Sequence, residues 1–168
     1  LCMPNSRVVE QVCLDTAGIV EGAKPGTLVL DAGTTTGRLA ALLSSERELI
    51  LITNSVPIGA RVASLPGIKL RMLGGRVRGT TQAAVGEEAL AALAWLRTDV
   101  AFIGTNALSL GHGLSTPDSD EAAVKRAMVR SANHVVVLAD SSKIGREHLV
   151  SFARLDDIDV LITDDGID

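Results

Sequence analysis

The sequence predicts an α/β domain, a three-layer sandwich around a largely parallel sheet. Three observations support this fold class: the chain has 168 residues, strand-like segments alternate with helix-like ones, and the strand-like segments are continuous apolar runs. Strands of this kind are buried on both faces, so the helices between them must cover the sheet. No repeat or linker divides the chain, and residues 1–168 are expected to form a single domain.

The first elements follow from hydrophobic spacing and from glycine and proline positions. Apolar residues over 7–20 recur at helical spacing, and "KPGT" at 24–27 separates this helix from the next element. A buried strand is expected at 28–32 ("LVLDA"), a short helix at 37–43 and a second strand at 49–53.

The middle of the chain continues the alternation. A helix over 56–64 and a strand at 68–73 are followed by a stretch rich in glycine and arginine at 74–86. A helix over 87–96 then leads to a fourth strand at 99–104 ("DVAFIG").

The C-terminal third supplies the last helix and two strands. A loop containing Gly111, Gly113 and Pro117 precedes a helix over 119–132. Apolar runs then predict strands at 134–140 and 159–164.

Composition argues against several classes of function. The net charge is −4 and aromatic residues make up 2% of the chain, so polyanions and unstacked bases are poor ligands. No apolar run approaches a membrane span and no signal peptide opens the chain, so we expect a cytoplasmic protein without a membrane partner. Cys2 and Cys13 are expected to be reduced thiols.

The sequence also predicts neither a metal nor a cofactor. His112, His134 and His148 lie far apart, without the spacing of metal ligands. The chain has neither a Gly-Lys-[Ser/Thr] phosphate loop nor a G-x-G-x-x-G dinucleotide turn.

Polar residues follow five of the predicted strands, at the point where each strand ends. In parallel α/β sheets, ligands bind outside the carboxyl ends of the strands, so these exits predict a site at one edge of the sheet. The exits are Asp31-Ala32-Gly33-Thr34-Thr35-Thr36, Thr53-Asn54-Ser55, Gly74-Gly75-Arg76, Gly104-Thr105-Asn106 and Asp140-Ser141-Ser142-Lys143.

The turn "DAGTTTG" at 31–37 is the most specific of these exits. A turn of glycine and threonine that enters a helix presents free backbone N–H groups and a partial positive charge, which suit a phosphate or carboxylate. In the alternative interpretation, a threonine is simply the N-cap of the next helix.

Five further residues at these exits have two interpretations each. Lys143 could hold the same anion or be a solvated loop lysine. Asp31 and Asp140 could accept hydrogen bonds from sugar hydroxyls or stabilise turns and caps. Asn54 and Asn106 could bind a polyol or only begin a loop.

Charged residues also gather at the predicted helix start, "STPDSDEAAVKRAM". Asp118 and Glu121 resemble a capping box, and Glu121 and Lys125 are spaced as an i,i+4 ion pair. The basic stretch "KLRMLGGRVR" could face an anionic ligand, a partner subunit or water, with water as the default.

In their order and spacing, these segments resemble the C-terminal effector-sensing domain of DeoR-family transcriptional repressors. The segments that carry the resemblance run from about Glu21 to the end of the chain: "LDAGTTT", "ITNS", "LGG", "VGEEAL", "FIGTN", "GLSTPDSDEAAVKRAM", "VVVLADSSKIG" and "DIDVLITD".

The resemblance implies a fold like that of ribose-5-phosphate isomerase and the CoA-transferases. It implies a phosphorylated sugar or related metabolite as effector, a homo-oligomer (dimer or tetramer), and operator binding through an N-terminal helix-turn-helix domain that this chain lacks. By this resemblance, the phosphate role falls to Gly33, Thr34, Thr35, Thr36 and Lys143, and the sugar contacts to Asp31, Asn54, Asn106, Glu121, Lys125 and Asp140. Ala107 stands where many members carry glycine and is expected to narrow the pocket.

The residues leave functions of different classes open. The favoured one is a non-catalytic sensor that shifts between two states when a sugar phosphate binds. The alternative is a sugar-phosphate isomerase-like enzyme with Glu121 or Asp140 as base and Lys143 stabilising the enediolate, although the isomerases' "DGAD" and "KGxG" segments are absent. A purely oligomerising module is the third.

Overall fold

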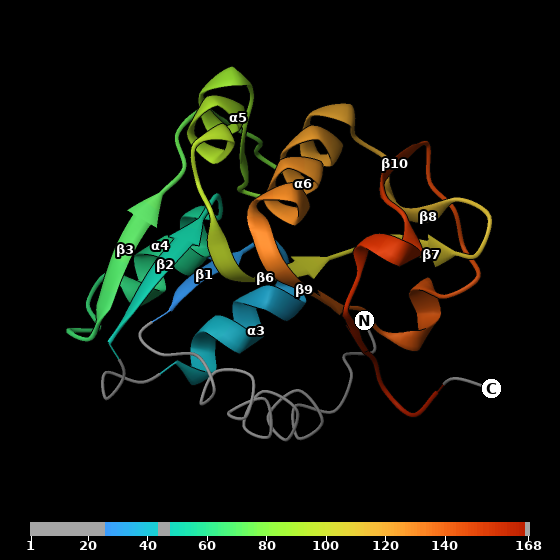
Figure 1. Cartoon of the computed structure of the whole chain (residues 1–168), viewed down its shortest axis with the longest axis horizontal. Helices are drawn as coiled ribbons and strands as arrows, with labels where there is room; N and C mark the ends of the chain where they lie inside the picture. Colours follow the sequence, from blue (N-terminus) through green and yellow to red (C-terminus); the bar gives the residue numbers. More distant parts are fainter. Residues whose placement is uncertain (1–25, 44–47, 167–168) are drawn as a thin grey trace.

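A six-stranded parallel sheet forms the centre of the computed structural model, which describes residues 26–43 and 48–166 (Figure 1). Every neighbouring pair in this sheet is parallel. All six predicted strands are present, with slightly different ends: β1 (Thr27–Leu30), β2 (Leu49–Thr53), β3 (Ile68–Met72), β6 (Thr98–Gly104), β9 (Ala132–Leu138) and β11 (Val160–Ile162). The helix expected over 7–20 and both cysteines lie outside the described residues.

The order of the strands, β11-β9-β6-β1-β2-β3, reverses direction at β1. The chain first adds β2 and β3 on one side of β1 and then adds β6, β9 and β11 on the other. The carboxyl ends of β1 and β6 therefore flank the switch point of the sheet, where parallel α/β folds bind their ligands.

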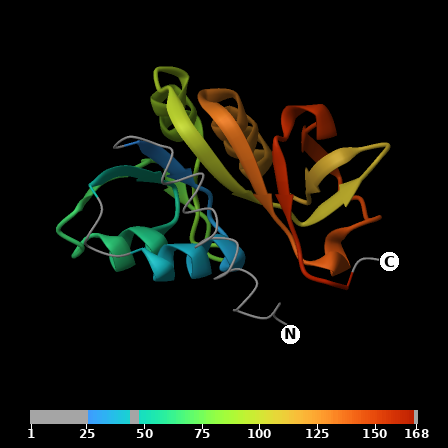
Figure 2. The same cartoon turned by 60° about the horizontal axis from the view of Figure 1, so that its bottom comes forward.

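Helices cover both faces of the sheet, which confirms the predicted three layers (Figures 1 and 2). Leu28 and Leu30 pack with α3 (Thr34–Leu42) and α4 (Val56–Val62), whereas Val29 between them packs with α5 (Glu87–Ala94) and α6 (Ser119–Ser131). This alternation follows from the two-residue period of a strand, and it explains why the strands are apolar throughout.

Helix α3 begins at Thr34, three residues before the predicted start at 37, which corrects the interpretation of the threonine turn. Its N-cap is Gly33, and no side chain caps it. The Thr36 hydroxyl donates to the Gly33 carbonyl at 3.1 Å, so the threonines form the first helical turn instead of capping it. Their low helix propensity made this start hard to recognise.

Two small antiparallel sheets were not predicted. The expected loop around Gly111 and Gly113 is a hairpin of β7 (Ala107–Ser109) and β8 (Gly113–Thr116), joined by β10 (Val150–Ala153). Gly113 has φ 71°, and a Cβ there would lie 2.2 Å from the Ala153 carbonyl oxygen, so this position requires glycine.

The second small sheet lies in the stretch at 74–86. Strands β4 (Arg76–Val77) and β5 (Ala84–Val85) pair as a hairpin, which we call the β4–β5 hairpin (residues 76–85). Two short 3₁₀ helices, η1 (Ser141–Lys143) and η2 (Leu155–Asp157), complete the described elements. Within 26–43 and 48–166, no helix has the length and apolar character needed to cross a membrane.

Candidate functional site

A cleft of roughly 1340 Å³ opens at the carboxyl edge of the parallel sheet. It is lined by the exits of β1, β2, β6, β9 and β11, so it lies at the predicted edge and includes the switch point. Of the predicted site residues, those that line it are Gly33, Thr34, Thr35, Thr36, Asn106, Glu121, Lys125, Asp140 and Lys143.

The N-terminus of α3 forms one end of the cleft. The Gly37 N–H makes the first helical bond, to the Gly33 carbonyl at 2.9 Å, and the N–H groups of the preceding turn are those that a helix leaves without a partner inside itself. Thr34 is exposed, whereas Thr36 is buried and its hydroxyl is already engaged. Backbone N–H groups and the Thr34 hydroxyl can thus reach an anion here.

Lys143 brings a positive charge to the same cleft. It lies in η1, its side chain is 36% exposed, and its ammonium is 4.0 Å from Asp140 Oδ2. Asp140 is the N-cap of η1, where its Oδ1 accepts hydrogen bonds from the Ser142 N–H and hydroxyl, as the cap interpretation predicted. Lys143 is therefore only loosely paired and can face a bound anion.

Asp31 and Lys125 form a buried ion pair beneath the cleft. Their side chains are 2% and 7% exposed, and the Lys125 ammonium donates to Asp31 Oδ2 and, at 2.8 Å, to the Gly104 carbonyl. The Gly104 N–H donates back to Asp31 Oδ2 at 3.1 Å. Lys125 therefore pairs with Asp31, not with Glu121 as the i,i+4 spacing suggested. Asp31 lies beneath the residues that line the cleft.

Burial is the largest influence on the pKa of the Asp31 carboxyl. It raises the pKa of the Asp31 carboxyl above the ordinary value of 3.8, although the Lys125 ammonium and the Gly104 N–H act to lower it. The Glu121 carboxylate nearby also raises this pKa.

The Asp31–Lys125 pair also has a structural role. It links the ends of β1 and β6 through α6, and so it fixes the spacing of these two strands at the switch point.

Glu121 brings a carboxylate to the cleft. It comes from the first turn of α6, and its Oε1 accepts hydrogen bonds from Arg78 and, at 2.5 Å, from the Thr81 hydroxyl. Arg78 also contacts Asp118 Oδ2 at 3.0 Å. Asp118 caps α6 through the N–H groups of Asp120 and Glu121, so half of the predicted capping box is formed.

The structure corrects the interpretation of the basic stretch. Arg76 pairs with Asp120 at 2.6 Å, in addition to the contacts of Arg78. These arginines bind acidic residues of the same chain, an alternative not considered above, whereas Lys69 and Arg71 are exposed on β3 as the default expectation had it.

Two other predictions change with the geometry. Asn54 is buried, its Oδ1 accepts from the Ala32 N–H at 3.1 Å, and its Nδ2 donates to the Ala84 carbonyl at 3.1 Å. This amide ties the β1 exit to β5 and is not placed for a sugar contact. Ala107 is fully buried in β7 and does not line the cleft, so it does not narrow it.

Sequence reasoning missed part of the lining. The tip of the β4–β5 hairpin, Gly79, Thr80, Thr81 and Gln82, reaches the cleft, as do Arg61, Asp164 and Asp165. Hydrogen bonds from Ser141 and from the Gly166 N–H hold the pKa of Asp164 below its usual value. The polar sequence "GTTQ" at this tip could have indicated a lining segment. It was missed because it does not directly follow a strand of the main sheet.

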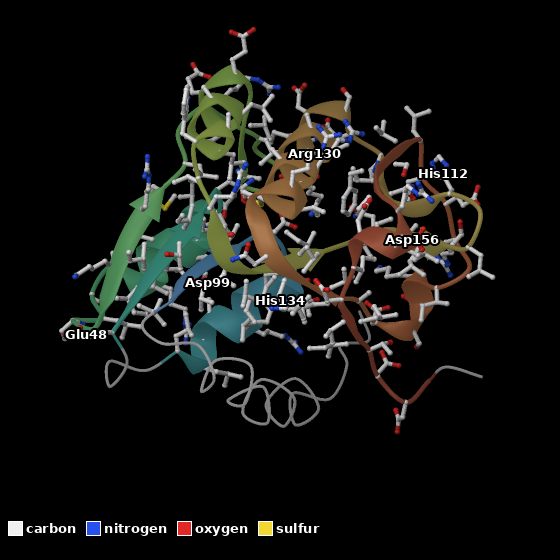
Figure 3. All side chains as sticks on the ribbon, viewed as in Figure 1. Glu48, Asp99, His112, Arg130, His134 and Asp156 are labelled. Carbon is white, nitrogen blue, oxygen red and sulfur yellow. The ribbon has the colours of Figure 1, made fainter. Side chains whose placement is uncertain are left out.

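The geometry gives no sign of a metal centre. Across the described part of the chain, no three His, Cys, Asp or Glu side chains are grouped to hold an ion. His112, near the small sheet, and His134, on β9, lie well apart in Figure 3.

A doubly covered parallel sheet with a polar cleft at its switch point defines a ligand-binding α/β domain. The model of the DeoR C-terminal sensor domain matches residues 17–165. The chain therefore belongs to the DeoR family of transcriptional regulators, as the C-terminal sensor domain.

Individual comparisons agree with this assignment. The chain is 37% identical over 150 residues to the HTH-type transcriptional regulator GlpR of Haloferax volcanii, covering 89% of this chain and 58% of that protein. Other curated relatives are named transcriptional repressors. The chain spans little more than half the length of these regulators.

Solved structures show the same fold at low identity. A probable sor operon regulator from Shigella flexneri has a TM-score of 0.62 and 12% identity, covering 96% of this chain and 86% of that one. Ribose 5 phosphate isomerase A from Neisseria gonorrhoeae has a TM-score of 0.53 and 12% identity, covering 85% and 56%. The predicted likeness to the isomerase fold is thereby confirmed.

Proposed function

We propose that this domain binds a phosphorylated sugar or related metabolite in the cleft, and that the bound effector modulates operator binding by the full-length repressor. The observation that carries the proposal is the presence of the α3 N-terminus and the half-buried, loosely paired Lys143 in one cleft. Backbone N–H groups and a lysine together suit a dianionic phosphate.

The sugar is proposed to extend across the floor toward Glu121. Asn106, Glu121 and Asp140 line its path, and each can exchange hydrogen bonds with hydroxyl groups. Asp31 contributes through Lys125, whose ammonium it holds at the floor.

The regulatory effect is proposed to arise from differential binding to two states. A ligand that contacts the exits of β1, β6 and β9 favours the state in which these exits are correctly spaced. We propose that operator DNA is bound by a helix-turn-helix domain outside this chain, in a cytoplasmic homo-oligomer. Charge favours this division, because the sequence carries a net charge of −4.

We further propose that the cleft binds its ligand without turnover. Each of the two carboxylates considered as an isomerase base has one oxygen engaged within the protein: Glu121 Oε1 by Arg78 and Thr81, and Asp140 Oδ1 by Ser142. Turnover of ribose 5-phosphate that is lost in Lys143→Ala would contradict this proposal and favour the enzyme.

Calorimetric titration with a panel of sugar phosphates tests the binding proposal. At least one member should bind, and a ligand at 100 times its dissociation constant should add about 2.7 kcal/mol to the free energy of unfolding. Absence of binding by every member would contradict the proposed function.

A further inference from the structure

Glu121 lines the cleft, and its two carboxylate oxygens differ in their hydrogen bonds. The Glu121 side chain is 10% exposed, and both hydrogen bonds that reach it end on Oε1. In the part of the chain that the structure describes, no hydrogen bond reaches Oε2, although Glu121 lines the cleft. Water can still reach Oε2 in the structure. A ligand that covers this oxygen must therefore offer a hydrogen-bond donor in place of the water.

The two groups on Oε1 come from the β4–β5 hairpin and are themselves held in place. One Nη of Arg78 pairs with Glu121 and the other with Asp118. Two ion pairs therefore fix the position of the guanidinium. The hairpin closes on itself through the Arg78 N–H to the Ala83 carbonyl, at 2.9 Å, and the Gln82 N–H to the Arg78 carbonyl, at 2.8 Å. It is tied to the sheet by the Ala84 N–H, which donates to the Asn54 carbonyl at 2.7 Å.

We propose, on the basis of the proposed function, that Arg78 and Thr81 are positioning residues of the effector site. By occupying Oε1, they turn Oε2 of Glu121 toward the cleft as an acceptor for a hydroxyl group of the bound ligand. The ligand class is a phosphate ester with a free hydroxyl group at the end remote from the phosphate. An ester with an alkyl group there would leave Oε2 unpaired, and a site with a buried, unpaired polar group discriminates strongly.

The hairpin supplies a matched control for this proposal. Arg76 and Arg78 lie two residues apart and pair with acidic residues of the same helix, but the Arg76–Asp120 pair is exposed and neither residue lines the cleft. Substitution of Arg76 by alanine therefore removes the same positive charge from the hairpin as substitution of Arg78, but it removes no contact to Glu121.

Titration calorimetry of the chain with four kinds of ligand tests the inference. The probes are inorganic phosphate, a hydroxyl-free alkyl phosphate, glycerol 3-phosphate, and a panel of ribose 5-phosphate, glucose 6-phosphate and fructose 1-phosphate. The unaltered protein should bind at least one hydroxyl-bearing ester more tightly than the alkyl phosphate.

Substitutions should then separate the two ends of the cleft. Arg78→Ala should weaken binding of the best hydroxyl-bearing ester about tenfold, as loss of a charged hydrogen bond does, while inorganic phosphate binds as before. Arg78→Lys should recover part of the loss, Thr81→Val should weaken the ester several-fold, and Arg76→Ala should change neither ligand. Lys143→Ala should weaken both ligands.

Several outcomes would overturn the inference. If Arg78→Ala does not fold, Thr81→Val decides the matter alone, because Thr81 lies at an exposed hairpin tip where the substitution should not disturb the fold. Unaltered ester affinity in the variants at Arg78 and Thr81, beside a weakened Lys143→Ala, would refute the role of the hairpin and leave the proposed function standing. Equal affinity for alkyl and hydroxyl-bearing esters would also refute the role of the hairpin and leave the proposed function standing. Failure of every phosphate ester to bind would overturn the proposed function and this inference together.

Discussion

The two ends of the proposed effector site are constructed in different ways. At the end proposed for the phosphate, backbone N–H groups of one helical turn and Lys143 line the cleft, and the residues involved adjoin strand ends. At the Glu121 end, the groups are side chains from distant segments: Lys125 and Asp31 are 94 residues apart, and Arg78 and Glu121 are 43 apart. The first end should therefore tolerate side-chain changes with little loss of stability, whereas the second couples recognition to folding.

The largest expected effect lies on the floor. Lys125→Met should lower the free energy of unfolding by about 3–5 kcal/mol, because it leaves the buried Asp31 carboxylate without its cation. Adding Asp31→Asn should restore much of the loss, since it removes the uncompensated charge. Urea denaturation at pH 7 measures the stability of the single and the double variant. A loss of less than about 1 kcal/mol in Lys125→Met would mean that the ion pair does not link α6 to the sheet as the geometry implies.

The pH dependence of Lys125→Met sharpens the same point. Burial already raises the pKa of Asp31, and Lys125 is the strongest influence opposing it, so its removal should raise this pKa further. A carboxyl whose pKa is higher in the folded state stabilises the fold at low pH and loses that contribution as the pH rises through the folded value. The deficit of Lys125→Met relative to the unaltered protein should therefore shrink on acidification, which denaturation curves from pH 7 to pH 4 would reveal. A deficit independent of pH would assign the loss to packing.

The phosphate end should show the opposite behaviour. Lys143→Ala should weaken sugar-phosphate binding roughly 10- to 100-fold, as expected for loss of a charge-assisted hydrogen bond, and change the free energy of unfolding by no more than about 0.5 kcal/mol. Parallel calorimetry and thermal denaturation give the two numbers. Comparable losses in both would contradict the contrast between the two ends.

The smallest expected effect distinguishes two neighbouring threonines. Thr34→Val should weaken binding a few-fold, because Thr34 is exposed and lines the cleft, and its hydroxyl has no hydrogen-bond partner within residues 26–43 and 48–166. Thr36→Val should instead cost about 1 kcal/mol of stability, since its buried hydroxyl donates to the Gly33 carbonyl. Calorimetry and thermal denaturation again measure the two effects. If Thr34→Val lowered stability and left binding unchanged, the threonines would have a purely structural role.

Much of the fold was predictable because its signals are local. The six strands of the main sheet are apolar runs that need burial on both faces, and the helices between them carry apolar stripes. The small sheets were missed because strands such as β4 and β5 are only two residues long and depend on contacts made by the rest of the chain. Gly113 is an example. In the sequence it is typical of a loop, and only the structure shows that the Ala153 carbonyl lies where a Cβ would be placed.

The sequence by itself determined the parallel sheet, the edge on which the polar exits gather and the resemblance to DeoR-family sensors. It did so because strand burial, helix periodicity and the residues after each strand are properties of contiguous segments. Only the tertiary structure decided that Lys125 bonds Asp31 instead of Glu121, and that Arg78 and Thr81 hold Glu121. A charged side chain takes the partner that burial brings closest, and that choice depends on how distant segments pack.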